Sequence, residues 1–147
     1  MLETIPILLV EDDNIDAKTV KRALQEIHIL NPLVTVQNGI EALEYLNDST
    51  QKRPGIILLD INMPKMNGIE FLRVAKNDLN LKAIPVVVLT TSQHEQDKVE
   101  SYNLGVAGYM IKPVDYLKFV EVVKTIHLYW TLSELPGEKR WNSLWKK

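Results

Sequence analysis

Short apolar runs that end in a polar side chain are the feature that most constrains the fold of this chain. In ILLDINMPKMNG, residues 57–68, the apolar run ends in Asp60 and is followed by the turn formers Asn62, Pro64 and Gly68. A continuous apolar run bounded by turn formers is typical of a strand that is covered on both faces in a parallel sheet. The acid at its end should emerge at the carboxyl edge of the sheet, where open α/β sheets bind their ligands.

The same pattern recurs along the chain, in alternation with helical segments. Predicted strands cover residues 6–10, 33–37, 57–60, 85–90 and 107–111. Each is followed by a segment in which apolar residues recur at helical spacing, and the last of these helices is predicted at about residues 114–130. Strands that alternate with helices form parallel β-α units with right-handed crossovers. We therefore expect an α/β fold, a three-layer α/β/α sandwich around a five-stranded parallel sheet.

Composition excludes several classes of protein. The chain has 147 residues, the size of one ordinary domain, and its 17 basic and 19 acidic residues leave a net charge of −2. Such a balance provides no general attraction for nucleic acid or for an anionic membrane. There are no cysteines, which excludes disulfides and thiolate chemistry. Neither a signal peptide nor an apolar run of roughly 18 residues is visible, so we expect a soluble, cytoplasmic protein without membrane or nucleic-acid partners.

Polar side chains gather where the predicted strands end. Glu11 and Asp12 follow the first strand, Asp60 the third, Thr90 the fourth and Lys112 the fifth. Each could be an ordinary solvated strand end, but together they fall on one edge of the sheet. Three crowded carboxylates repel one another unless a cation shares the space, and carboxylate oxygens suit Mg²⁺. A lysine and a hydroxyl opposite would bind an anionic group, so the pattern indicates phosphoryl transfer to an aspartate.

Four motifs carry a resemblance to a known family. LLVEDD, LLDINMPKMNG, VVVLTTS and GYMIKP occur in the order and spacing of the receiver domains of two-component response regulators, which the chain resembles over about residues 5–128. The resemblance implies a flavodoxin-like fold with the strand order 2-1-3-4-5. It also implies a signalling domain that catalyses only its own phosphorylation and dephosphorylation, and not an enzyme that acts on other substrates.

The resemblance assigns a role to each residue of the acidic edge. Asp60 matches the phosphoacceptor. Asp12 and Asp60 would bind Mg²⁺ directly, the backbone carbonyl of Asn62 would be a further ligand, and Glu11 would act through a water molecule. Lys112 would pair with the phosphoryl group or, before modification, with Asp60 itself. Many receivers have aspartate at the position of Glu11. The longer glutamate keeps the charge but moves it by about one methylene group, so metal binding should be preserved.

The same resemblance implies a switch and a control of hydrolysis. The hydroxyl of Thr90 would donate to a phosphoryl oxygen, and Tyr109, the aromatic switch residue, would rotate into the space left behind. The surface formed by the fourth helix, the fifth strand and the fifth helix would then change. Asn62 and Ser92 would tune hydrolysis of the acyl phosphate by helping or failing to orient the attacking water.

The last predicted helix has apolar residues on two sides, although one side is enough to cover the sheet. An exposed apolar patch commonly marks a protein interface, so we expect a homodimer. The residues that we predict for this interface are Phe119, Val122, Ile126, Tyr129 and Trp130.

Residues 1–130 are predicted to form the receiver domain, and residues 131–147 a short extension without a separate output domain. We expect Trp141 or Trp145 to fold onto the domain or onto a dimer mate. The missing output domain, the Glu-Asp pair, VVVLTTS and the YW ending of the last helix resemble the small response regulators of bacterial and cyanobacterial phytochrome histidine kinases. The expected partner is therefore a sensor histidine kinase of the phytochrome type.

Three alternatives remain open at this point. A haloacid-dehalogenase-like phosphohydrolase also forms an aspartyl phosphate, but it needs a second aspartate at the position of Asn62. A flavodoxin-type electron carrier shares the fold, but the acids after the first strand would repel the phosphate of FMN. A scaffold that binds its partners without phosphorylation would have no need of the five polar residues.

Overall fold

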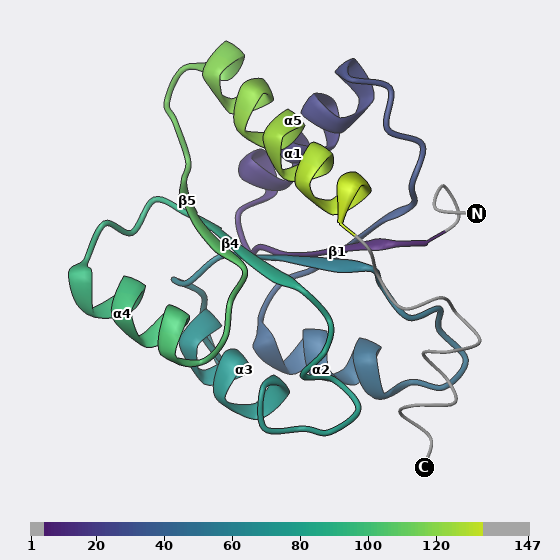
Figure 1. Ribbon diagram of the computed structural model, residues 1–147, viewed down its shortest axis with the longest axis vertical. Coiled ribbons are helices and arrows are strands. Elements are labelled where there is room, and N and C mark those ends of the chain that lie inside the picture. Colours follow the sequence, from purple (N-terminus) through teal and green to yellow (C-terminus); the bar gives the residue numbers. More distant parts are fainter. Residues whose placement is uncertain (1–4, 134–147) are drawn as a thin grey trace.

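The computed structural model describes residues 5–133, in which five parallel strands form one sheet with helices on both faces (Figure 1). The strands are β1 (Ile7–Val10), β2 (Leu33–Val36), β3 (Ile56–Leu59), β4 (Val86–Thr90) and β5 (Gly108–Ile111). They lie in the order β2-β1-β3-β4-β5, and every pair is parallel. Both the five predicted strands and the order 2-1-3-4-5 are confirmed.

Five helices complete the three layers. They are α1 (Asn14–Glu26), α2 (Gly39–Asn47), α3 (Gly68–Ala75), α4 (Glu95–Asn103) and α5 (Tyr116–Leu132). Helices α1 and α5 cover one face of the sheet, while α2, α3 and α4 lie on the other (Figure 1). No helix in the described part of the chain is long and apolar enough to cross a membrane.

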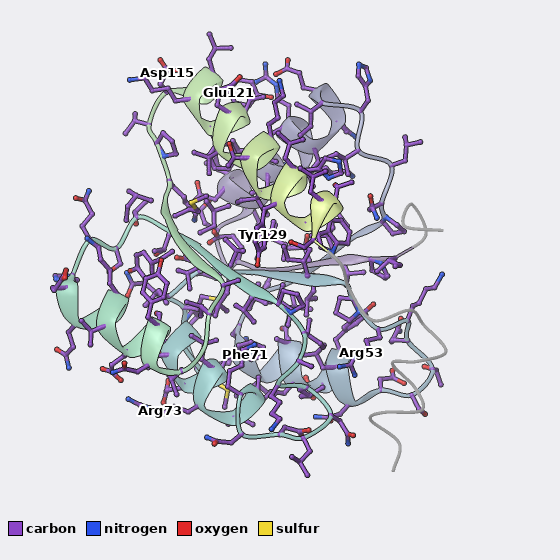
Figure 2. The ribbon with its side chains drawn as sticks, in the orientation of Figure 1. Arg53, Phe71, Arg73, Asp115, Glu121 and Tyr129 are labelled. Atoms are coloured by element: carbon purple, nitrogen blue, oxygen red, sulfur yellow. The ribbon has the colours of Figure 1, made fainter. Side chains whose placement is uncertain are left out.

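The core has two halves, one on each face of the sheet. In β1, Ile7 and Leu9 belong to the half under α1 and α5, and Leu8 and Val10 belong to the opposite half. Successive strand residues alternate between faces, so a strand covered on both sides needs an unbroken apolar run. The side chain of Phe71 on α3 is fully buried in the second half, whereas Arg73 of the same helix points outward to an ion pair with Glu100 of α4 (Figure 2).

Side-chain caps begin α1, α2, α3 and α5 close to the carboxyl edge of the sheet, whereas α4 has no side-chain cap. The carboxylate of Asp13 accepts hydrogen bonds from the backbone N–H groups of Ile15 and Asp16, at 2.8 and 3.0 Å, and so begins α1. Asn67 begins α3 with a capping box that it shares with Glu70. These caps satisfy N–H groups that the helix leaves unpaired, and they make the turn from strand to helix abrupt. The residues between strand and helix are thereby held at the edge.

The predicted interface on α5 is partly wrong. Phe119, Ile126 and Trp130 are buried in the core against α1 and the sheet, so the domain already uses them. Their spacing places them in the stripe that a helix turns toward its own sheet. Of the other predicted residues, Val122 is half-buried and Tyr129 is 52% exposed.

A second apolar side of α5 nevertheless exists. Leu117, Leu128 and Leu132 are exposed at 73%, 48% and 80%. Their helical spacing places them on the side of α5 that also carries Glu121, which is labelled in Figure 2. Helix α5 ends at Leu132, two residues later than predicted. The predicted contacts of Trp141 and Trp145 lie outside the described residues.

Candidate functional site

The five polar residues predicted at the strand ends lie at one edge of the sheet. Glu11 and Asp60 directly follow the neighbouring strands β1 and β3, Thr90 ends β4, and Lys112 follows β5. Backbone hydrogen bonds continue the sheet one residue beyond the strands: Asp60 N–H donates to Val10 O at 3.0 Å, and Lys112 N–H donates to Thr90 O at 2.8 Å. These backbone hydrogen bonds therefore hold the Cα positions of Asp60 and Lys112 at the edge of the sheet.

Three carboxylates form a compact cluster. One oxygen each from Glu11, Asp12 and Asp60 lie within 4.8 Å of one another. Glu11 and Asp60 are buried, whereas Asp12 is exposed. Carboxylate oxygens are the donors that hard divalent cations prefer, and an exposed member leaves a path for the ion and its water molecules. The cluster fits a divalent metal ion.

Asp60 presents its two carboxylate oxygens to different surroundings. Oδ1 accepts a hydrogen bond from the backbone N–H of Ile61 at 2.8 Å, and Oδ2 lies 3.7 Å from the ammonium nitrogen of Lys112. The side chain of Asp60 is only about 10% exposed. Asp60 is therefore a buried carboxylate with a fixed orientation and a nearby cation.

Lys112 has closer partners than the predicted one. Its ammonium forms a short hydrogen-bonded ion pair with Oε1 of Glu11, and its distance to Oδ2 of Asp16 is 3.0 Å. The pairing with Asp60 that we predicted is the longest of the three. Sequence reasoning missed Asp16, although its place four residues after Asp12 puts it in the first helical turn beside the same edge.

Burial dominates the electrostatics of the Glu11–Lys112 pair. Burial raises the pKa of Glu11 to about 7, even though the hydrogen bond and the charge of Lys112 act to lower it. For Lys112, burial acts to lower the pKa, but the hydrogen bond to Glu11 and the charges of Asp60 and Glu11 outweigh it and leave the pKa raised. Burial thus disfavours the charged form of both groups, and their mutual attraction favours it.

The switch residues are joined through the loop after β4. Thr90 is fully buried, and its hydroxyl oxygen accepts a hydrogen bond from the N–H of Ser92 at 3.2 Å. The half-buried Tyr109 donates its hydroxyl to the carbonyl oxygen of Ser92 at 2.9 Å, and burial raises the Tyr109 pKa. The hydroxyl of Ser92 donates to Asp97 of α4 at 2.6 Å. Ser92, which we predicted to tune hydrolysis, therefore turns its hydroxyl toward α4.

A close backbone approach shapes the loop after β3. A Cβ atom on Gly68 would lie 2.3 Å from the carbonyl oxygen of Asp60 and 2.9 Å from Cα of Ile61. The N–H of Gly68 donates to Ile61 O at 2.9 Å. Only glycine fits at this contact, which folds the loop bearing the exposed Asn62 back onto the end of β3.

A parallel sheet in the order 2-1-3-4-5, with an acidic cluster facing a lysine and a buried hydroxyl at its carboxyl edge, defines a receiver domain. The model of the response regulator receiver domain family matches residues 7–124 of this chain. The chain therefore belongs to the response regulator receiver domain family. The phosphohydrolase alternative is not favoured.

Relatives and solved structures agree with this assignment. Response regulator Rcp1 from Synechocystis sp. is 38% identical over 128 residues, which cover 84% of this chain and 87% of the relative. The crystal structure of the phosphorylated cyanobacterial phytochrome response regulator RcpA is similar with a TM-score of 0.85 and 39% identity, over 91% of this chain and 99% of that chain. The Mn²⁺-bound form of Rcp1 is similar with a TM-score of 0.81 and 36% identity, over 89% and 97%.

Proposed function

We propose that this response regulator accepts a phosphoryl group on Asp60 in a Mg²⁺-dependent reaction. The observation that carries the proposal is the setting of Asp60, a buried carboxylate between two other acids and the ammonium of Lys112. A carboxylate oxygen of Asp60 attacks the phosphorus of the donor, the bond between phosphorus and the donor atom breaks, and the donor leaves with the bonding electrons. The product is an acyl phosphate.

The acidic cluster supplies the ligands for the metal ion. Asp12 and Asp60 would hold Mg²⁺ directly, together with the backbone carbonyl of Asn62, while Glu11 would act through a water molecule. When bound there, Mg²⁺ would neutralise charge on the phosphoryl oxygens, which together with positioning is what phosphoryl transfer requires. Lys112, 3.7 Å from Asp60, provides a second positive charge, and the N–H of Ile61 holds one oxygen of Asp60 in place.

The signal leaves the site through Thr90 and Tyr109. A phosphoryl group on Asp60 would draw the Thr90 hydroxyl toward its oxygens and away from the N–H of Ser92. The carbonyl oxygen of Ser92 accepts a hydrogen bond from the hydroxyl of Tyr109, and the hydroxyl of Ser92 donates one to Asp97 of α4. A movement of this loop therefore changes both β5 and α4. The α4-β5-α5 surface is therefore the output surface of the switch. Asn62 and Ser92 would set how fast the acyl phosphate hydrolyses.

The donor in the cell is proposed to be a sensor histidine kinase of the phytochrome type, and the chain is proposed to act in the cytoplasm as a homodimer. The similarity to Rcp1 and RcpA supports the kinase partner, because RcpA is a phytochrome response regulator. The exposed apolar side of α5, with Tyr129 and Leu128, supports the homodimer.

Intact-mass spectrometry tests the phosphoryl acceptor. We expect one phosphoryl adduct after incubation with Mg²⁺ and a small acyl-phosphate donor, and hydroxylamine should cleave it. The adduct should be absent from Asp60→Asn and from protein treated with EDTA. An adduct that persists in Asp60→Asn would contradict the assignment, and a wild-type protein that neither forms an adduct nor binds beryllofluoride would be a scaffold that works without phosphorylation.

A further inference from the structure

Asp16 shares the ammonium of Lys112 with the acids of the site. It belongs to the first turn of α1, whereas Lys112 follows β5, and the two side chains meet at 3.0 Å. The side chain of Lys112 is 7% exposed and that of Asp16 is 41% exposed. The ion pair therefore lies on the α1 side of the site, where the lysine is buried and the aspartate is in contact with solvent.

The distances show where the ammonium is held. An ammonium group has three N–H donors, and Glu11 and Asp16 both lie within hydrogen-bond distance of it. The distance of 3.7 Å to Asp60 is longer than a hydrogen bond. Lys112 is thus held beside Asp60 by two other carboxylates, and these compete with any anionic group on Asp60 for its N–H donors.

Glu11 and Asp16 do not hold Lys112 in the same way. Glu11 is part of the acidic cluster, so its charge also serves the metal ion. Asp16 is not a member of that cluster, so its charge remains available to Lys112 when a metal ion binds. Asp16 is therefore the carboxylate outside the metal cluster whose attraction opposes a shift of Lys112 toward Asp60.

We infer that Asp16 is a positioning residue that competes with the phosphoryl group on Asp60 for the ammonium of Lys112. This inference rests on the proposed function. Removal of the Asp16 carboxylate releases Lys112 toward Asp60 and stabilises the phosphorylated form relative to the unmodified one. Because the pair is partly exposed, the effect is expected to be about two- to fivefold in affinity for a phosphoryl mimic.

Titration with beryllofluoride in the presence of Mg²⁺ tests the inference. We expect Asp16→Asn to bind beryllofluoride about two- to fivefold more tightly than wild type, and Asp16→Glu, which keeps the carboxylate, to return toward the wild-type affinity. The affinity for Mg²⁺ alone should not rise, because Asp16 lies outside the acidic cluster and a Lys112 ammonium released toward Asp60 repels the metal ion. A purely structural role of Asp16 would weaken binding in both titrations.

Glu95→Gln is the matched control. Glu95 is an exposed acid in the first turn of α4, so this variant removes one negative charge from another helix without touching Lys112. An equal gain of affinity in Glu95→Gln would show a general effect of charge and overturn the inference, as would an unchanged or weaker affinity in Asp16→Asn. With either result, phosphorylation of the wild type would still support the proposed function. A wild-type protein that neither reacts nor binds beryllofluoride would contradict the proposed function and this inference together.

Discussion

At the scale of single residues, the site depends on backbone contacts as much as on charged side chains. Asp60 is held by the N–H of Ile61 on one oxygen, while its own carbonyl group touches the position where Gly68 would carry a side chain. The loop that bears Asn62 is therefore fastened to the end of β3 by a contact that only glycine allows. The acid and its loop are therefore joined into one unit by backbone contacts.

Gly68→Ala should distort this unit. Its Cβ would meet the carbonyl oxygen of Asp60 at 2.3 Å, and because that oxygen belongs to the backbone, it cannot move away cheaply. We expect a loss of about 1–3 kcal/mol in the free energy of unfolding, together with weaker beryllofluoride binding. Urea denaturation measures the first effect and beryllofluoride titration the second.

Gly108→Ala provides the comparison for this prediction. A Cβ atom at Gly108 would have its nearest neighbour, Val87, at 3.9 Å, which is an ordinary contact. The substitution should therefore cost less stability and leave beryllofluoride binding unchanged. Equal losses in the two variants would contradict the role assigned to Gly68.

At the scale of elements, α5 serves the core with one face and leaves another face in water. Its buried stripe includes Phe119, Val123 and Trp130, which belong to the core between α1, α5 and the central strands of the sheet. His127 lies beside this stripe, with its ring edge-on to Trp130 at a centroid distance of 6.3 Å. Its Nδ1 atom is buried and has no hydrogen-bond partner among the residues that the structure describes. A positive charge on this ring is therefore unfavourable in the folded state.

His127 should make stability depend on pH in the mildly acidic range. Burial lowers the pKa of His127 below its ordinary value of 6.5. As the pH falls below 6.5 the unfolded chain takes up the proton first, so stability decreases until the folded state is protonated too. We expect His127→Gln to lose less stability than wild type between neutral pH and the lowered pKa.

Thermal unfolding across this pH range tests the prediction. His94→Gln is the control, because His94 is an exposed residue at the start of α4. This control should follow the wild-type pH dependence. A His127→Gln curve parallel to that of wild type would mean that another group causes the acid sensitivity.

At the scale of the whole molecule, the fold leaves an apolar surface that its own core does not need. Leu117, Leu128 and Leu132 recur at helical spacing along one exposed side of α5, and the exposed Tyr129 follows Leu128 in the chain. The proposed output surface, α4-β5-α5, includes this helix. The elements that change on phosphorylation, β5 and α4, are therefore neighbours of the proposed dimer contact on α5. Phosphorylation is therefore expected to tighten the proposed homodimer.

Leu128→Glu tests the proposed homodimer. A carboxylate on the exposed side of α5 should shift the molar mass from dimer toward monomer, with little change in stability, because Leu128 is 48% exposed. Light scattering with and without beryllofluoride measures the mass. Leu79→Glu, at a 71% exposed position between α3 and β4, should behave as wild type. An unchanged wild-type monomer in both conditions would remove the homodimer.

Much of the fold followed from local pattern. Unbroken apolar runs specify buried strands, and the alternation with helical spacing specifies parallel β-α units, so the sheet and the edge bearing Glu11, Asp60, Thr90 and Lys112 were predictable. The order of the strands came from the resemblance to receiver domains, because local pattern says which segments are strands but not which of them are neighbours.

The sequence by itself therefore determined the strands, the helices and the polar residues at one edge, because each depends on spacing along the chain. Only the tertiary structure decided which apolar side of α5 enters the core, and hence that Phe119, Ile126 and Trp130 do not form a surface. It also decided that Lys112 lies closer to Glu11 and Asp16 than to Asp60. The physical reason is the same in both cases: the orientation of a helix and the partner of a charge are set by packing between segments that are distant in sequence.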